Sequence, residues 1–518
     1  MTVSGAPIPS ERKTGMTTAR VTLDPRLSVG EVDRRLFGSF VEHLGRCVYD
    51  GLYEPSHPSA DEDGFRTDVM ALVRELGVTT VRYPGGNFVS GYRWEDGVGP
   101  REERPRRLDL AWHSTETNEI GLDEFARWAR KTDTELMYAV NLGTRGVLEA
   151  LDVLEYANVP GGSFWSDRRA ANGTPQPHGI RMWCLGNEMD GPWQLGASTP
   201  AEYAEIASKT AKAMRQVDPG VELVVCGSSG AQMPTFGEWE RVVLERTYED
   251  VDFISCHAYY EPKDGDDGSF LASATDMDRF IESVVATADA VGAARGSDKR
   301  INISFDEWNV WYQSRFTEVD KITEIDQWPV APRLLEDSYR VMDAVVVGNL
   351  LISLLRHADR VKAASLAQLV NVIAPIMTEP GGPAWRQTTF FPFAESARLS
   401  RGRALDVRLD SPEYDTAQYG RVPIVDAVAT HDPATGSTAL FAVNRSLDEE
   451  VTLEIDLTLL GEVTTMTAQV LADDDMHARN TLEDPERVAL RELHLDRSAD
   501  GVVRVALPRV SWVVVTLR

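Results

Sequence analysis

Residues 182–188 are Met-Trp-Cys-Leu-Gly-Asn-Glu, a short apolar run that stops at an amide and a carboxylate. Residues 301–308 are Ile-Asn-Ile-Ser-Phe-Asp-Glu-Trp, a second mainly apolar run that stops at carboxylates, here Asp306 and Glu307. Apolar runs of about four to eight residues bounded by polar residues are typical of buried strands in parallel sheets. The two stretches therefore predict two parallel strands that carry Glu188 and Glu307 at their carboxyl ends.

Similar runs alternate with amphipathic, helix-like stretches from about residue 36 to about residue 380. This alternation predicts repeated β-α units, and eight strands are the number that closes a barrel. The predicted fold class is therefore α/β, with a (β/α)8 TIM barrel. The eight expected strands are Phe37 to Glu42, Thr79 to Pro84, Glu135 to Asn141, Met182 to Glu188, Glu222 to Cys226, Phe253 to Tyr259, Ile301 to Glu307 and Lys362 to Leu369.

A second domain is expected because 518 residues exceed what one hydrophobic core usually organises. After about residue 385 the helical periodicity fades, and short alternating runs indicate a small β-sandwich. We expect a disordered tail over residues 1–18, a strand that starts at Ala19, a barrel over 36–384 and a sandwich over 385–518. No low-complexity linker separates the two halves, so we expect them to pack tightly.

The composition excludes several classes of partner. The chain has 53 basic and 81 acidic residues and a net charge of -28, which repels nucleic-acid phosphates and anionic membranes. No long apolar run and no signal-peptide pattern occurs, so we expect a cytoplasmic protein. The four cysteines lack metal-ligand spacing, so we expect reduced buried thiols, no metal and no cofactor.

Polar side chains crowd the carboxyl ends of the expected strands, where barrel enzymes place their reacting groups. Two carboxylates from different strands that face one cavity are what glycoside hydrolysis requires. Glu188 and Glu307 meet this description. Asp306 is expected to be a structural hydrogen-bond partner, because neighbouring strand residues point to opposite faces.

Aromatic and histidine side chains near these ends have two possible roles. His257 and Tyr259 lie two residues apart on one strand face, where either can bond a carboxylate, and a structural core histidine is the alternative. The tryptophans near the strand ends can be packing residues or sugar platforms, and loop positions favour the platform for Trp112 and Trp311. The segment from residue 309 to 336 is longer than a connector needs, so we expect it to shape the site.

Five motifs together resemble one family. They are Gly38-Ser-Phe-Val-Glu-His-Leu-Gly45, Arg82-Tyr-Pro-Gly-Gly-Asn-Phe-Val-Ser-Gly-Tyr92, Trp183-Cys-Leu-Gly-Asn-Glu-Met-Asp-Gly-Pro-Trp193, Ser304-Phe-Asp-Glu-Trp-Asn-Val-Trp-Tyr312 and Ala367-Gln-Leu-Val-Asn-Val-Ile-Ala-Pro-Ile376. The chain is similar to the intracellular α-L-arabinofuranosidases of glycoside hydrolase family 51, from about residue 19 to its end. The resemblance implies that the N-terminal strand (residues 19–35) joins a jelly-roll-like sandwich and that the chain forms homo-hexamers.

The same resemblance implies a role for each site residue. Glu188 would be the acid/base and Glu307 the nucleophile of a retaining double displacement on a terminal arabinofuranosyl oligosaccharide. Four side chains would hold the sugar hydroxyls: Glu42, Asn87, Asn187 and Gln368. Four others would support the carboxylates or line the pocket: Tyr259, His257, Trp112 and Trp311.

Two rival functions stay open at this point. One is a glycosidase of the same clan that acts on another sugar, such as a β-xylosidase, a galactofuranosidase or an endoglucanase. The other is a carbohydrate-binding protein without catalysis. The presence of both carboxylates and their polar neighbours disfavours the second.

Overall fold

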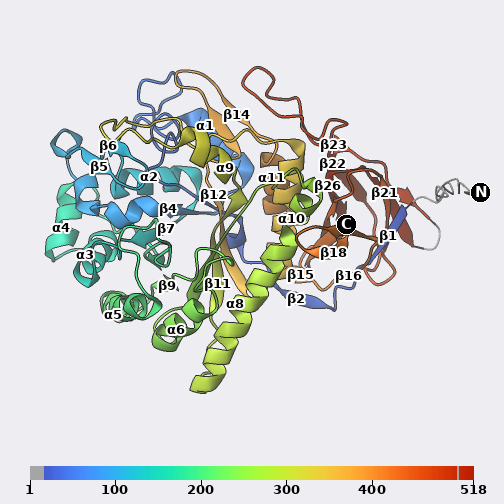
Figure 1. Cartoon of the computed structure of the whole chain (residues 1–518), viewed down its shortest axis with the longest axis horizontal. Helices are drawn as coiled ribbons and strands as arrows, with labels where there is room; N and C mark the ends of the chain where they lie inside the picture. Colours follow the sequence, from blue (N-terminus) through green and yellow to red (C-terminus); the bar gives the residue numbers. More distant parts are fainter. Residues whose placement is uncertain (1–16, 499–500) are drawn as a thin grey trace, which may run out of the picture.

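The computed structural model describes residues 17–498 and 501–518, and its main feature is the predicted closed barrel of eight parallel strands (Figure 1). All eight expected strands are present, with ends that differ by a few residues. Around the barrel they follow the order β3, β4, β7, β8, β9, β10, β11, β12. Their bounds are β3 Gly38–Phe40, β4 Thr80–Tyr83, β7 Glu135–Val140, β8 Met182–Leu185, β9 Glu222–Val225, β10 Phe253–Tyr260, β11 Asn302–Val310 and β12 Val361–Ala367.

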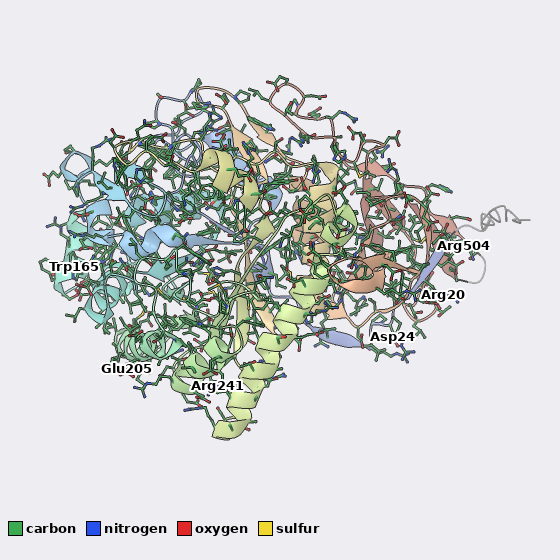
Figure 2. All side chains as sticks on the ribbon, in the orientation of Figure 1. Arg20, Asp24, Trp165, Glu205, Arg241 and Arg504 are labelled. Atoms are coloured by element: carbon green, nitrogen blue, oxygen red, sulfur yellow. The ribbon has the colours of Figure 1, made fainter. Side chains whose placement is uncertain are left out.

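Helices surround the barrel, with an apolar face on the strands and charged side chains outside, such as Glu205 and Arg241 (Figure 2). Helix α5 begins at a capping box, since Thr199 accepts a hydrogen bond from the backbone of Glu202 and Pro200 follows it. No helix among the described residues has both the length and the apolar character that a bilayer span needs. The main helices are α1 Thr67–Leu76, α2 Leu122–Thr132, α3 Val147–Asn158, α4 Phe164–Ala171, α5 Pro200–Val217, α6 Glu238–Thr247, α8 Ala274–Arg295, α10 Val341–Arg356 and α11 Phe390–Leu399.

Two further sheets pack face to face beside the barrel and enclose a second hydrophobic core (Figure 1). N-terminal strands join both sheets, as the family resemblance implies: β1 (Thr17–Thr22) pairs with β16 and β21, and β2 (Ser28–Glu31) pairs with β15. Residues 1–16 of the expected tail lie outside the described residues, and Thr17 and Thr18 already belong to β1. The other strands are β15 Arg403–Leu405, β16 Arg408–Asp410, β19 Val425–Asp432, β20 Ser437–Asn444, β21 Val451–Asp456, β22 Met466–Leu471, β23 Arg491–Glu492, β24 Asp496–Arg497, β25 Val502–Leu507 and β26 Ser511–Leu517.

The last helix fixes where the barrel ends. Helix α11 follows the eighth strand of the barrel and packs against α1 and α10, which are barrel helices. A division after residue 384 would assign α11 to the sandwich. We therefore propose that the barrel domain extends to Leu399.

All four cysteines are free and buried, as their spacing predicts.

A buried polar network joins the two domains. Helix α10 packs on strands β19, β20 and β26 of the sandwich. At this contact Arg445 Nη2 donates to Asp426 Oδ2 over 2.6 Å, and Arg445 Nε donates to Asn349 Oδ1 over 2.8 Å. Arg356 of α10 also pairs with Asp426. Because the Asp426 carboxylate is largely shielded from water, its negative charge needs the two arginines to compensate for the loss of solvent.

Replacing Arg445 with Met is expected to lower the free energy of unfolding by about 2–4 kcal/mol, because Asp426 then loses its most buried cationic partner. Urea unfolding followed by circular dichroism measures this. The matched control is Arg421→Met, whose exposed pair with Glu413 should contribute only about 0–1 kcal/mol. Equal losses in both variants would contradict the role given to the network.

Candidate active site

The predicted site residues converge at the carboxyl ends of the barrel strands. Glu42 follows β3, Glu188 follows β8, and Glu307 lies within β11. All three carboxylates are buried, with exposures of 2%, 8% and 5% respectively. The barrel therefore brings acidic groups from three strands into one enclosed region, although they are about 119 to 265 residues apart along the chain.

Glu188 and Glu307 form a close pair. One carboxylate oxygen of each lies within 4.8 Å of the other, and a nitrogen of His257 lies within the same distance of both. Carboxyl groups roughly 5 to 5.5 Å apart are typical of retaining glycosidases, whereas inverting enzymes leave room for a water molecule and separate them by roughly 6.5 to 9.5 Å. The pair therefore has the spacing of a nucleophile and an acid/base.

His257 lies between the two carboxylates. Its Nδ1 is 2.9 Å from Glu188 Oε1 and 3.7 Å from Glu307 Oε2. Burial disfavours the charged imidazole, but the charge of Glu307 and the hydrogen bond to Glu188 outweigh burial and raise the pKa of His257. The imidazole thus contacts both carboxylates.

Arg82 was not identified from the sequence, yet it holds the Glu307 side. Its Nη1 donates to Glu307 Oε1 over 2.8 Å, and the Tyr259 hydroxyl donates to Oε2 over 2.7 Å. Burial opposes ionisation of Glu307, but His257 and Arg82 and these two hydrogen bonds lower its pKa. Glu307 is therefore ionised and oriented, as a nucleophile must be.

Asp306 is a structural partner, as expected, but the reason given from the sequence is wrong. Its carboxylate accepts a hydrogen bond from Ser304 and lies 3.8 Å from Arg82 Nε, so it points into the barrel like Glu307. The register of β11 against β10 shifts between Ser304 and Glu307, where β11 carries one extra residue. This bulge lets two consecutive side chains face the barrel interior.

Glu42 is fixed by three hydrogen-bond donors. Trp112 Nε1 donates to its Oε1 over 2.8 Å, the Phe88 backbone donates to the same atom over 2.9 Å, and Gln368 Nε2 donates to Oε2 over 3.2 Å. Burial dominates these hydrogen bonds and raises the pKa of Glu42 to about 8. Glu42 is therefore protonated at neutral pH and has a proton to donate to a hydroxyl oxygen.

Two asparagines extend the network from Arg82. Asn187 Oδ1 accepts from Arg82 Nη2 over 2.6 Å, and its Nδ2 is 3.4 Å from Asn87 Oδ1. Close backbone approach makes this possible, because a Cβ at Gly86 would lie 3.1 Å from Glu307 Oε1. The Gly85-Gly86 turn thus presents Asn87 to the site.

Trp193 is a second residue that the sequence did not single out for the site. Its indole nitrogen donates to Glu188 Oε2 over 2.6 Å, and 52% of the side chain is exposed. Glu188 itself has a φ of 44°, a conformation that non-glycine residues rarely adopt. The loop after β8 therefore turns the acid toward the mouth, where Trp193 faces solvent.

The long segment after β11 closes one side of the mouth. Its Phe316 contacts both Trp112 and Trp311, with ring centroids about 6 Å apart in each pair. Trp311 packs edge-on against Tyr259 at 5.1 Å, and Thr115 of the β5–β6 hairpin (Arg107–Asp109 and Ser114–Glu116) bonds to the backbone of Pro329. The segment thus shapes the site, as its length predicts.

The group formed by Glu188, His257 and Glu307 is compact enough to surround a metal ion. Each of the three already has a protein partner, and the Arg82 guanidinium places a positive charge against Glu307. The donor set is therefore arranged for proton transfer between side chains. Every residue predicted for the site belongs to one contact network, and Arg82 and Trp193 complete it.

Two protein families match separate regions of the chain. Residues 72–279 match the α-L-arabinofuranosidase 1 domain, and residues 306–511 match the α-L-arabinofuranosidase C-terminal domain. Together these regions contain Glu188, Glu307 and most of the sandwich.

Individual proteins are similar over nearly the whole chain. An intracellular exo-α-(1→5)-L-arabinofuranosidase from Streptomyces lividans is 62% identical over 96% of this chain and 75% of its own. An exo-α-(1→6)-L-arabinofuranosidase from Bifidobacterium longum is 59% identical over 96% and 97%. A solved family 51 α-L-arabinofuranosidase from Bifidobacterium longum is 53% identical and superposes with a TM-score of 0.93 over 97% of this chain and 100% of that one.

Replacing Arg82 with Lys is expected to lower kcat by about 10- to 100-fold, because lysine keeps the charge but lacks the planar fork that bonds Glu307 and Asn187. Arg82 also lowers the pKa of Glu307, so the acid limb of kcat/KM against pH should move to higher pH.

The matched control is Arg181→Lys, an exposed arginine just before β8 at the opposite end of the barrel. It should leave both kcat and the pH profile as they are. A lower kcat in Arg82→Lys with an unmoved acid limb would show that the hydrogen bond from Arg82 does not help to set the ionisation of Glu307.

Proposed function

The chain belongs to glycoside hydrolase family 51, and from this membership we infer that it is a retaining, exo-acting α-L-arabinofuranosidase that releases terminal arabinofuranose. The observation that carries the assignment to this site is the carboxylate pair within 4.8 Å, with different partners on its two members. The roles of individual residues are our proposal.

In the first step, a Glu307 oxygen attacks C1 of the terminal sugar while Glu188 gives its proton to the departing glycosidic oxygen. The C1–oxygen bond breaks, and a sugar ester with Glu307 forms. Tyr259 and Arg82 hold Glu307 in its ionised form until the attack. The leaving group departs on the side of Glu188.

In the second step, Glu188 takes a proton from a water molecule, whose oxygen attacks C1 and displaces Glu307. Two inversions at C1 retain its configuration. His257 bonds Glu188 in both steps and responds to the charge of Glu307, which disappears in the ester and returns after it. This supports the change of Glu188 from acid to base.

The sugar is held by groups that donate and accept hydrogen bonds at fixed positions. Asn187 and Asn87 lie beside the nucleophile, and the protonated Glu42, which is bonded to Gln368, also lies close to it. We assign Asn187 to the 2-hydroxyl of the sugar, where a hydrogen bond strengthens at the transition state. Oligosaccharides derived from arabinan or arabinoxylan are the proposed substrates.

Relatives whose names describe them as intracellular support an intracellular location.

We also propose that the chain forms a homo-oligomer, a hexamer by analogy with the family. Three large apolar side chains, Leu110, Val319 and Ile325, are between 61% and 84% exposed, and contact with another subunit would cover them. Sedimentation equilibrium should give six times the chain mass of 57.4 kDa. A mass equal to one chain would contradict an oligomer.

Replacing Glu188 with Ala is expected to lower kcat/KM on natural arabinosides by about 10²- to 10⁴-fold, because the leaving oxygen then departs unprotonated. An activated nitrophenyl arabinofuranoside should still form the ester. Azide, which needs no general base, should restore its turnover and give an arabinofuranosyl azide of retained configuration. Product analysis by NMR measures this.

The matched control is Glu102→Ala, an exposed acid away from the site, which should keep full activity. Full activity of Glu188→Ala, or no azide rescue, would contradict the assignment of Glu188. Parallel assays of the unaltered enzyme on nitrophenyl xyloside, nitrophenyl galactofuranoside and a β-glucan test the other sugars of the clan. No turnover on any substrate would favour a binding protein.

A further inference from the structure

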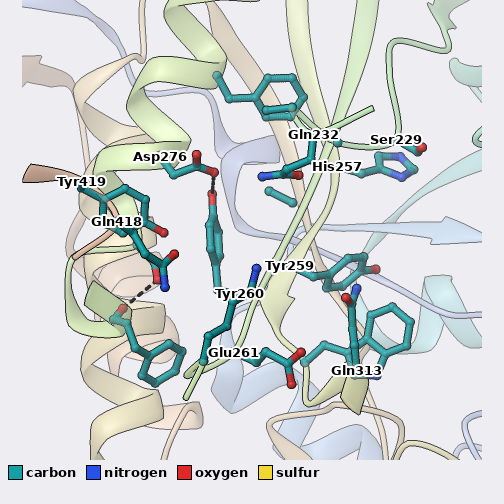
Figure 3. A pocket seen from close by; sticks show the side chains of 18 residues that line it. Ser229, Gln232, His257, Tyr259, Tyr260, Glu261, Asp276, Gln313, Gln418 and Tyr419 are labelled. Atoms are coloured by element: carbon teal, nitrogen blue, oxygen red, sulfur yellow. Dashed lines mark hydrogen bonds between the residues drawn. The ribbon is translucent and has the colours of Figure 1, made fainter. Parts of the chain in front are cut away.

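A pocket of about 460 Å³ opens beside the carboxylate pair and extends away from it (Figure 3). Its volume falls within the range of roughly 300–1,000 Å³ that is usual for small-molecule sites. His257 and Tyr259 lie at one end, and Gln418 and Tyr419 lie at the other. The pocket therefore runs from residues that contact the carboxylate pair to residues of the C-terminal region.

The inner end of the pocket lies on the side of the acid. His257 bonds Glu188 through Nδ1, and the Ser229 backbone in the pocket wall donates to Asp190, two residues after Glu188. Because Glu188 protonates the departing oxygen, the leaving group emerges next to this wall. A sugar chain attached to that oxygen has the pocket directly in front of it.

The outer end is built by the C-terminal region. The hairpin of β17 (Glu413–Thr416) and β18 (Gly420–Pro423) reaches over the short helix α7 (Asp267–Leu271), which precedes α8. It is anchored there by the Tyr414 hydroxyl, which donates to the Gly268 carbonyl over 2.9 Å. Gln418 and Tyr419 form the tip of this hairpin and line the pocket.

The lining has the chemistry of a carbohydrate site. Aromatic rings of Tyr259, Trp311 and Tyr419 provide apolar faces. The side-chain amides of Gln232, Gln313 and Gln418 also line the pocket, and none bonds another protein group within residues 17–498 and 501–518. Unpaired amides combined with aromatic faces suit a neutral, polyhydroxylated ligand.

The acidic groups of the pocket are already engaged. Asp276 accepts a hydrogen bond from the Tyr260 hydroxyl over 3.2 Å, and Glu261 accepts one from Ser314 Oγ over 2.8 Å. These carboxylates therefore support the walls, and the amides remain for the ligand. A cationic ligand has less reason to bind here than a sugar.

We propose that this pocket binds the leaving-group portion of the substrate, a chain of neutral sugar residues, and that Gln418 and Tyr419 determine how strongly longer chains are bound. This inference rests on the proposed arabinofuranosidase function. It assigns a role in substrate selection to the C-terminal domain, which supplies none of the residues of the carboxylate network.

The test compares substrates that differ only in their leaving group. In the unaltered enzyme kcat/KM should rise from arabinobiose to arabinotriose and arabinotetraose. Gln418→Ala combined with Tyr419→Ala should lower kcat/KM about tenfold for arabinotetraose, and much less for nitrophenyl arabinofuranoside, whose leaving group is short. The change should appear mainly in KM, because these contacts are the same before and during bond breaking.

Two further variants keep the test independent of folding. Gln418→Ala alone removes an exposed amide without hydrogen bonds to the protein, so the fold should be unaffected, and arabinotetraose should still lose kcat/KM. Gln216→Ala, on the exposed surface of α5, is the matched control and should change neither substrate. Thermal unfolding midpoints verify each variant.

Equal losses on arabinotetraose and on the nitrophenyl substrate would overturn the inference. So would an unaltered enzyme whose kcat/KM does not depend on chain length. In both cases the nitrophenyl arabinofuranoside is still hydrolysed, so the proposed function survives. Failure of the unaltered enzyme to hydrolyse that substrate would overturn both.

Discussion

The buried pairing of Arg82 with Asp306 and Glu307 is the interaction on which the site depends. Several acidic side chains meet at one end of the barrel, shielded from water, where an uncompensated charge costs several kcal/mol. Arg82 supplies a permanent positive charge beside these acids, and its guanidinium group also donates a hydrogen bond to Asn187. The surrounding backbone fits this pairing, because glycines let β4 and its loop approach Glu307 closely.

The two carboxylates to which we assign catalysis differ because their partners differ. Glu307 accepts hydrogen bonds from Arg82 and Tyr259, both of which favour its charge. Glu188 is bonded to a histidine and to the partly exposed Trp193, so its surroundings can adapt as its proton leaves and returns. Rigid charge stabilisation on one side and an exchangeable contact on the other match the division between a nucleophile and an acid/base.

Strand positions were predictable from the sequence because buried parallel strands leave short apolar runs, and polar residues at their ends marked the site. Arg82 was missed because it lies inside such a run. Nothing within the run indicates what balances its buried charge, which in the fold is paired with Asp306 and Glu307 of β11. The orientation of Asp306 was also beyond reach, since a one-residue bulge in β11 reverses the alternation of side chains without changing the sequence pattern. Trp193 needed the left-handed turn at Glu188 to face the acid.

Chemistry and substrate selection are placed on different parts of the chain for a physical reason. Reacting groups must be held to within fractions of an ångström, which strands of a closed barrel achieve and loops seldom do. Leaving groups of different length need only a wall that can vary. The hairpin carrying Gln418 and the long segment after β11 provide such walls, because neither is part of the barrel. An enzyme of this fold can thus keep the same carboxylate pair and change its preferred linkage through the hairpin and the segment after β11.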